Sequence, residues 1–468
     1  MFVQQLYTNC ISEAAYYIES NGECAIIDPL RDVEVYLNLA KERNATIKYI
    51  FETHFHADFV SGHLDLAKHS NAPIVFGPNT KTLFPVYIAK DEEQFKIGNL
   101  TIKVLHTPGH TLESTCYLLK DETNKDYCVF TGDTLFVGDV GRPDLAQDAE
   151  ISINDLAGMM YDSIQLKLIP LADDVLIYPA HGPGSACGKN LGAETFSTIA
   201  VQKKTNYALM ATSKEQFIKT VTDGLEATPK YFPMNVKLNK EGYSTLESLL
   251  NKSNKALTID AFKTLAKEDK TMILDSRNSS LFTLGFIPAS ISIGLEGRFA
   301  EWAGALIPFD ESVLLVCDEG KEEETIIRLA RVGFDKVKGY LLGGFNAWKN
   351  AGEPIDLIID VEADELAMDI PHDENLVVID VRKETEFADG HVKDALNLPL
   401  AEMNDPFVLS NLEESDNLYV HCAGGYRSVI ASSLIKRQGF HNLRNVVGGF
   451  EKIKEQKIKI IKETSVLN

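Results

Sequence analysis

Histidine and aspartate residues follow several apolar, strand-like runs of the sequence. They occur in THFHADF (His54, His56 and Asp58), TPGHT (His110), FTGDT (Asp133) and YPAHG (His181). Imidazole nitrogens and carboxylate oxygens are common protein ligands of zinc and iron. One HxH pair is weak evidence, because a lone histidine is more often a hydrogen-bonded surface or core residue. Several such side chains at strand ends together predict a metal centre.

A second candidate for chemistry is Cys422, which begins the loop CAGGYRS after the apolar run LYV. Backbone N–H groups of successive loop residues form a nest that binds anions. The loop residues expected to surround the sulfur are Ala423, Gly424, Gly425, Tyr426 and Ser428. The nest and the neighbouring Arg427 both favour a thiolate, so we predict that Cys422 is a nucleophile.

The first half of the chain must position the histidine and aspartate side chains. Its predicted strands each end on a histidine, aspartate or threonine: ECAIID, IKYIFET, LTIKVLH, YCVFTGD and VLIYPAH. Sites in α/β folds lie at such strand ends. Residues 188–255 are predicted to be helical at first and then coil-like around PKYFPMNVKLNKEG.

The second half contains an internal repeat. ILDSR and VIDVR, LLVCDEG and YVHCAGG, and LLGGFNAW and NVVGGFEK form three matched pairs, and each pair has the same offset along the chain. A constant offset implies two tandem copies of one fold. Both copies alternate β-branched strands with helix-like segments, which indicates α/β units around a mostly parallel sheet. We predict domains at 1–250, including a helical extension and connector, at 256–356 and at 360–466.

Composition limits the possible partners and the compartment. The chain has 468 residues and a net charge of −22, which would repel a nucleic-acid backbone. No apolar run has the length of a membrane helix, and the start MFVQQLYTNC has no secretory pattern. Seven cysteines without a CxxC pair indicate a reducing, cytoplasmic environment. Neither nucleic acid nor a membrane is expected as a partner, and a homo-oligomer is the expected state.

The first 240 or so residues resemble the metallo-β-lactamase superfamily, and more closely its persulfide dioxygenase branch. The histidine and aspartate motifs carry this resemblance, together with GDVGRPD, which contains Arg142. The resemblance implies an αββα sandwich and one iron(II) per chain, held by His54, His110 and Asp133. Most hydrolases of that fold have a third histidine where this chain has Phe59. His56, Asp58 and His181 would then orient the ligands, with a weak second metal as the alternative.

The loop HGPGSACGK departs from the glutathione-using members of that branch, which place an aspartate and a tyrosine there. The identity of the thiol carrier therefore stays open. Cys187 lies in this loop, and with Arg142 we assign it to the substrate loop. Two interpretations of Cys187 stand side by side: a residue that carries sulfane sulfur, and a small buried residue in a tight loop.

The second repeat resembles a rhodanese sulfurtransferase domain through VIDVRKETEFADGHVKDALNLP and VHCAGGYRS. The resemblance implies that Cys422 takes and gives sulfane sulfur. In the first repeat the loop reads CDEGKEEE, so Cys317 lacks the arginine, and acidic neighbours disfavour its thiolate. We predict a degenerate domain there. The opposing interpretation is that Lys321 rescues an active Cys317.

The resemblances together imply a function in sulfur metabolism. The iron site would use O2 to oxidise a small-molecule thiol persulfide to sulfite, and Cys422 would form or use thiosulfate. One alternative is a binuclear thioester hydrolase similar to glyoxalase II, against which Phe59 counts. Another is a sulfur carrier whose first domain only docks a partner.

Overall fold

The computed structural model describes residues 1–146, 150–410 and 412–463. Residues 464–466 of the predicted third domain lie outside this description. The chain forms two compact units, one comprising Met1–Ser248 with Leu329–Gly333, the other Leu249–Arg328 with Phe334–Asn468. In the described part of the chain, no helix is both long and apolar enough to cross a membrane.

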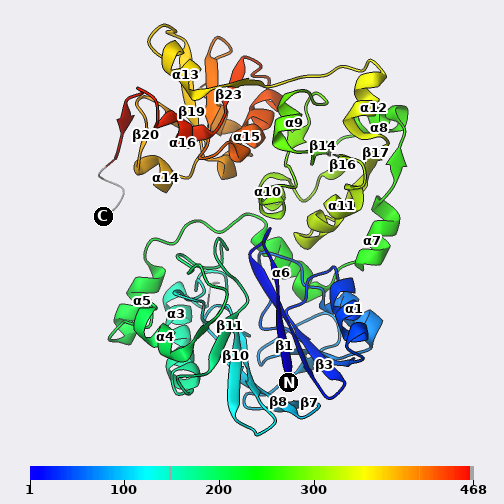
Figure 1. Ribbon diagram of the computed structural model, residues 1–468, viewed down its shortest axis with the longest axis vertical. Coiled ribbons are helices and arrows are strands. Elements are labelled where there is room, and N and C mark those ends of the chain that lie inside the picture. The colour runs from blue at the N-terminus through cyan, green and yellow to red at the C-terminus, as the bar shows by residue number, and fades with distance from the viewer. Residues whose placement is uncertain (147–149, 411, 464–468) are drawn as a thin grey trace. The chain divides into compact units, whose positions relative to one another are not determined.

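Two six-stranded sheets form the first unit (Figure 1). The first sheet has the order β1 (Phe2–Thr8), β2 (Glu13–Ser20), β3 (Glu23–Ile27), β4 (Thr46–Phe51), β5 (Ile74–Phe76) and β6 (Tyr87–Ile88). The second has the order β12 (Ser197–Thr198), β11 (Leu176–Pro179), β10 (Asp126–Gly132), β9 (Thr115–Lys120), β8 (Leu100–His106) and β7 (Gln94–Ile97). In the first sheet, β1 to β3 pair antiparallel and β3 to β6 pair parallel. In the second sheet, β10 pairs parallel with β11, and the other neighbours pair antiparallel.

The first unit buries a core between its sheets and another on the outer face of each. Strand β2 shows why, because successive side chains point to opposite faces. Tyr16 packs between the sheets, whereas its neighbour Tyr17 packs outward against the helices α1 (Glu34–Glu42) and α2 (His63–Ser70). The second sheet is covered by α3 (Ile153–Ser163), η1 (Ile164–Leu168), α4 (Ile199–Thr205) and α5 (Lys214–Thr222). These layers confirm the predicted αββα sandwich.

One local prediction was wrong. The segment predicted to be coil-like forms the helix α6 (Phe232–Glu241), which is followed by α7 (Leu246–Ser253). Pro233 lies in the first turn of α6, where its missing N–H breaks no helical hydrogen bond. The buried residues of α6 include Asn235 and Asn239. Polar residues facing inward conceal a helix from a hydrophobic pattern.

The second unit contains two five-stranded parallel sheets. The first has the order β13 (Ala256–Leu257), β17 (Val337–Leu341), β16 (Ser312–Val316), β14 (Thr271–Asp275) and β15 (Ile291–Ser292). The second has the order β18 (Ile359–Val361), β23 (Leu443–Val446), β22 (Asn417–His421), β19 (Leu376–Asp380) and β21 (Leu396–Asn397). A two-stranded sheet joins β20 (His391–Val392) and β24 (Ile460–Ile461).

Helices accompany both parallel sheets. The first repeat has α8 (Ile259–Ala266), α9 (Ser279–Thr283), α10 (Phe299–Leu306), α11 (Glu322–Arg331) and α12 (Gly344–Asn350). The second has α13 (Ala363–Asp369), α14 (Glu384–Ala388), η2 (Leu400–Glu402), η3 (Pro406–Leu409), α15 (Tyr426–Arg437) and α16 (Gly449–Ile453). The matching strand orders confirm that two copies of one α/β fold follow each other.

Each repeat also contains the same kind of buried ion pair between an arginine and an aspartate. Arg277 Nη2 lies 2.6 Å from Asp275 Oδ2, and Arg382 Nη2 lies 2.6 Å from Asp380 Oδ2. Each arginine also donates a hydrogen bond to a glycine carbonyl eight residues further along its own chain segment. Arg277 and Arg382 are therefore structural groups that hold the loop after the second strand of each repeat.

Candidate metal centre and sulfur-transfer loop

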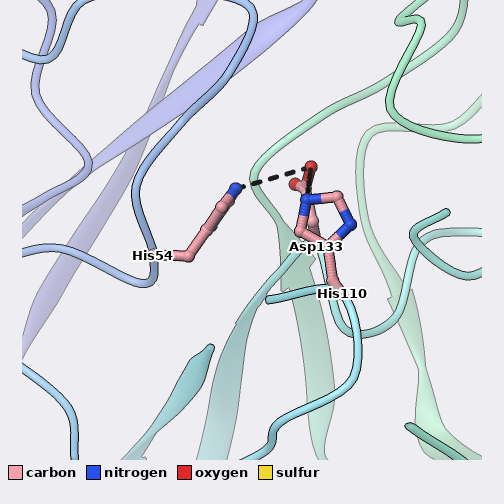
Figure 2. Close-up of side chains that lie close together, drawn as sticks. All are labelled: His54, His110 and Asp133. Carbon is pink, nitrogen blue, oxygen red and sulfur yellow. Dashed lines mark ion pairs between the residues drawn. The ribbon is translucent and has the colours of Figure 1, made fainter. Parts of the chain in front are cut away.

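Three buried side chains converge at one end of the sandwich. His54 follows β4, His110 lies between β8 and β9, and Asp133 follows β10. His54 Nε2 is 3.7 Å and His110 Nε2 is 3.4 Å from Asp133 Oδ2 (Figure 2). Their three ligand atoms lie within 4.8 Å of one another, as atoms that share one metal ion must. The structure thus brings the predicted ligand set together.

The chemistry of these three groups fits a divalent metal. His54 Nε2 and Asp133 Oδ2 are buried, and among the described residues neither has a hydrogen-bond partner. Burial lowers the pKa of both His54 and His110, so both imidazoles are neutral and keep a lone pair. Burial alone would raise the pKa of Asp133, but the charge and the hydrogen bond of His181 outweigh it and hold that pKa below its ordinary value.

Neighbouring oxygens orient both imidazoles. His54 Nδ1 lies 3.0 Å from Thr53 Oγ1, and Thr53 Oγ1 donates to Asp28 at 2.8 Å. His110 Nδ1 lies 2.9 Å from the carbonyl oxygen of Arg142, to which it must donate. A proton on Nδ1 leaves Nε2 of His110 free to bind a metal.

His181 and Asp58 lie next to the three-ligand set, on the side of Asp133. His181 Nδ1 lies 2.7 Å from Asp133 Oδ1, and His181 Nε2 lies 2.9 Å from Asp58 Oδ2. Burial opposes a charge on His181, but Asp133 and Asp58 outweigh it and raise its pKa well above the ordinary value. Each ring nitrogen of His181 thus lies next to a carboxylate, and the two carboxylates favour its protonated form.

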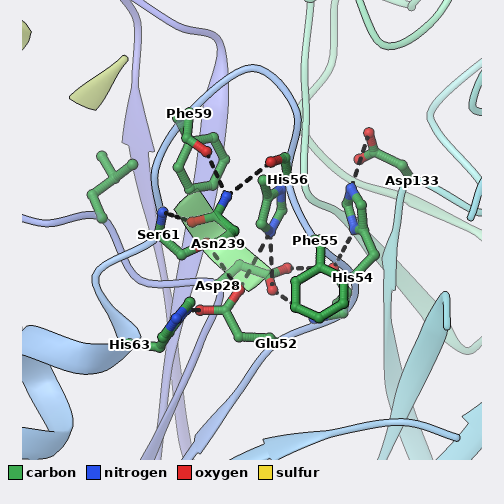
Figure 3. Close-up of polar contacts among 12 residues, drawn as sticks. Asp28, Glu52, His54, Phe55, His56, Phe59, Ser61, His63, Asp133 and Asn239 are labelled. Carbon is green, nitrogen blue, oxygen red and sulfur yellow. Dashed lines mark hydrogen bonds and ion pairs between the residues drawn. The ribbon is translucent and has the colours of Figure 1, made fainter. Parts of the chain in front are cut away.

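His56 lies beside the three-ligand set, with its ring centroid 4.2 Å from that of His54. Its Nε2 lies 3.2 Å from Asp28 Oδ1 and 3.7 Å from Glu52 Oε2, and its ring stacks on Phe59 with centroids 4.2 Å apart (Figure 3). Glu52 also contacts His63 Nδ1 at 3.0 Å. Phe59 is fully buried, so an apolar ring fills the position next to Asp58.

Helix α6 contacts the segment that contains THFHADF through its buried Asn239. Asn239 donates to the carbonyls of His56 at 2.8 Å and Phe59 at 2.9 Å, and it accepts from the N–H of Ser61 at 2.9 Å (Figure 3). One buried amide thus satisfies three backbone groups of a segment that belongs to none of the named strands. The conformation of THFHADF depends on this residue.

The substrate-loop residues lie next to the metal centre. Cys187 is buried, and its sulfur lies within 4.8 Å of ligand-type atoms of Asp133 and His181. Burial raises the pKa of the Cys187 thiol well above its ordinary value, and Asp58 and Asp133 raise it further. Arg142 is bound at 2.7 Å to both carboxylate oxygens of Asp144. The backbone N–H of Arg142 donates to the carbonyl of Cys187, so Arg142 supports the loop that contains Cys187.

The Cys422 loop lies in the second unit, between β22 and α15. The N–H of Gly425 donates to the sulfur of Cys422 at 3.0 Å, and Ser428 Oγ lies 3.7 Å from that sulfur. Gly425 has a φ of 113°, a conformation that favours glycine. Arg427 forms two bonds to Glu386, at 2.7 and 2.9 Å. Ala423, Gly424 and Tyr426 complete the loop.

Cys317 occupies the equivalent position in the first repeat. It borders a cavity of about 280 Å³, which is also lined by Arg277, Asp318, Glu319, Phe345 and Lys349. Burial raises the pKa of the Cys317 thiol to about 12, and Asp275 and Glu322 add to the increase.

We expect Cys317 to react slowly with iodoacetamide at neutral pH, with a rate that rises up to about pH 12. The raised pKa keeps the sulfur protonated below that pH, and only the thiolate is nucleophilic. Mass spectrometry of the labelled peptides measures both cysteines in one sample, with Cys422 as the internal comparison. Rapid labelling of Cys317 near pH 7 would contradict the prediction that this repeat is degenerate.

Comparison with known proteins finds a matching family for each of the two parts of the chain. A family model described as the metallo-beta-lactamase superfamily matches residues 9–181, and a rhodanese-like domain model matches residues 258–351 and 362–456. The probable hydroxyacylglutathione hydrolase glo2 of Schizosaccharomyces pombe is 32% identical over 187 residues, which are 39% of this chain and 68% of that protein. The chain belongs to the metallo-beta-lactamase superfamily.

Two further similarities show how far the likeness extends. The mitochondrial hydroxyacylglutathione hydrolase of Saccharomyces cerevisiae is 27% identical over 232 residues, which are 47% of this chain and 75% of the yeast protein. The crystal structure of a metallo-beta-lactamase from Staphylococcus aureus subsp. aureus COL is 31% identical. It has a TM-score of 0.64 and covers 73% of this chain and 98% of its own. This metallo-beta-lactamase superfamily member thus carries two rhodanese-like domains.

Some groups that shape the metallo-beta-lactamase site were missed by sequence reasoning. Asp28 ends the strand-like run ECAIID, so its strand-end position was a usable signal. Glu52 and Thr53 precede the HxH motif directly and were overlooked. Asn239 had no signal, because a single asparagine in a polar segment matches no metal-site pattern.

Proposed function

We propose that the metallo-beta-lactamase domain oxidises the terminal sulfur of a low-molecular-weight thiol persulfide with O2, using one iron(II) per chain. The observation that carries this proposal is the division of the site into two unlike halves. His54, His110 and Asp133 aim ligand atoms at one point, whereas His181 is tied to Asp58 and Asp133. Two imidazoles and one carboxylate are the ligand set of non-haem iron(II) oxygenases.

The proposed reaction balances without another reductant. One persulfide, one O2 and one water give one thiol, one sulfite dianion and two protons. The sulfur–sulfur bond breaks, the terminal sulfur is oxidised and O2 is reduced. His54, His110 and Asp133 would hold the iron(II), which would supply open positions for both a sulfur anion and O2.

The protein's own residues prepare this site. The carbonyl of Arg142 fixes the tautomer of His110, and His181 keeps Asp133 ionised and oriented. The protonated His181 also supplies positive charge beside the place where an anionic substrate would lie. Buried Phe59 excludes water from the side of the site next to Asp58.

Sulfur transfer at Cys422 is the second part of the proposal. A Cys422 persulfide gives its outer sulfur to sulfite, so the cysteine sulfur–sulfur bond breaks while a bond to sulfite forms. The products are thiosulfate and the Cys422 thiolate, and the reverse reaction uses thiosulfate to form the persulfide. The Gly425 N–H holds the sulfur anion in either direction. Tethering the two domains raises the concentration of sulfite available to Cys422.

A second candidate function is thioester hydrolysis. The hydroxyacylglutathione hydrolases of S. pombe and S. cerevisiae favour it, because their sequences match the same domain. The group formed by His56, Asp58 and His181 offers atoms within 4.8 Å of one another for a second metal. A binuclear hydrolase would need to break the His181 ion pairs to use them.

We expect about one iron per chain and persulfide-dependent O2 uptake from protein purified without oxygen. Metal analysis counts iron and zinc, an oxygen electrode follows O2, and ion chromatography measures sulfite and thiosulfate. A lactoyl thioester serves as the control substrate and should not be cleaved. Two zinc ions per chain, thioester cleavage and no O2 uptake would contradict the proposal and support the hydrolase instead. The cytoplasmic setting and homo-oligomeric state predicted from the sequence belong to the same proposal.

A further inference from the structure

Helix α15, which follows the Cys422 loop, is buried on both of its faces. Residues 428–436 are all buried, whereas a helix that covers only its own sheet keeps an exposed stripe. The second face of α15 packs on the first repeat. The N–H of Ser292 in β15 donates to Ser433 Oγ at 3.1 Å, and Lys436 Nζ lies 2.8 Å from Asp356 Oδ1.

The contact between the repeats reaches the Cys422 loop through Tyr426. The Tyr426 hydroxyl donates to the carbonyl of Gly294 at 2.8 Å. The tyrosine ring lies against Gly297, since a Cβ added at Gly297 would be 2.2 Å from a ring carbon. Only glycine leaves room for the ring there. Gly294 and Gly297 belong to a loop of the first repeat. Arg328 of the same repeat holds that loop, because its guanidinium donates to the carbonyl of Leu295 at 2.8 Å.

Tyr426 is covalently joined to the residue that contacts the sulfur. Gly425 donates its N–H to Cys422 at 3.0 Å, and its carbonyl accepts from Ser428 Oγ at 2.9 Å. The next residue along the chain is Tyr426, which the first repeat holds by its hydroxyl and its ring. A movement of Tyr426 would therefore move the Gly425 N–H away from the sulfur.

We propose that the first repeat is a positioning element of the Cys422 site. Gly294 and Gly297 hold Tyr426, and Tyr426 sets the Gly425 N–H on the sulfur. This gives the degenerate domain a task that needs no reactive Cys317. The inference rests on the proposed sulfur transfer at Cys422 and adds the residues that prepare it.

Charged groups from both repeats face this loop. Arg427 and Glu386 come from the second repeat, and Glu296, Glu301 and Arg328 come from the first. A test of position should leave all of these charges in place. Substitutions at Gly297 and at the Tyr426 hydroxyl meet this condition.

Gly297→Ala in the full-length protein is the main test. The added methyl must displace the Tyr426 ring. The proposal predicts that the Gly425 N–H moves with it. Loss of the hydrogen bond that holds the sulfur anion should slow the alkylation of Cys422 by iodoacetamide at neutral pH by about tenfold. Thiosulfate formation from persulfide and sulfite should fall about tenfold to a hundredfold, as misplaced catalytic groups do. Tyr426→Phe, which keeps the ring, should change both quantities in the same direction but less.

Gly285→Ala is the matched control. It makes the same substitution in the same repeat, but the added methyl would meet Phe345, 3.1 Å away. We expect wild-type alkylation and sulfur transfer from it. The inference is overturned if Gly297→Ala keeps the wild-type rates of alkylation and sulfur transfer, or if Gly285→Ala loses as much as Gly297→Ala. If the wild-type protein transfers no sulfur but Gly297→Ala still slows the alkylation of Cys422, the proposed sulfur transfer is refuted and the positioning is supported.

Discussion

His110→Ala is expected to remove the proposed iron and, with it, the proposed O2-dependent consumption of persulfide. His110 Nε2 is one of the three ligand atoms at the centre, and alanine offers no replacement. Loss of a group that merely supports a metal ligand already costs about 10- to 100-fold in metal affinity or activity, so loss of a ligand should exceed that. Metal analysis and an oxygen electrode measure both effects on the same sample.

His69→Ala provides the control for this substitution. His69 is an exposed histidine in α2 and takes no part in the ligand clusters of the described residues. It should keep the iron and the O2 uptake of the unmodified protein. If His110→Ala retained a full complement of iron, the assignment of the ligand set would be wrong.

Cys422→Ser is expected to separate the two proposed activities. Thiosulfate formation should fall by at least about 10³-fold, because removing a nucleophile commonly costs more than that and a serine hydroxyl does not form a persulfide. O2 uptake should persist, and sulfite should accumulate, because the metal site lies in a different domain. Ion chromatography of sulfite and thiosulfate during persulfide oxidation measures the outcome.

Cys317→Ser is the paired control, since it makes the same exchange at the equivalent position of the first repeat. It should leave thiosulfate formation unchanged. Loss of thiosulfate in Cys317→Ser, with retention in Cys422→Ser, would reverse the assignment of the active and degenerate repeats.

The sequence predicted the fold and much of the candidate site because both depend on local patterns. Strands that end on His54, His110 and Asp133 must bring polar groups to one end of a sandwich. The constant offset between Cys317 and Cys422 revealed the duplication without any structural information.

The remaining groups depend on contacts between distant parts of the chain. His181 lies between Asp58 and Asp133, three residues that come from separate segments and that no single motif joins. Gly297 and Tyr426 belong to different repeats, and no motif joins them. The helix that contains Asn239 was predicted as coil, because its inward-facing asparagines weaken the hydrophobic periodicity that marks a helix.

The Asn239 contacts set a physical limit on how the first domain can be excised. The family match ends at residue 181, but the amide that holds the segment THFHADF comes from α6, which ends at Glu241. A fragment cut at residue 181 would leave the carbonyls of His56 and Phe59 and the N–H of Ser61 without their partner, at about 1–3 kcal/mol for each group that stays buried. An excised first domain therefore has to extend at least through α6, beyond the end of the family match.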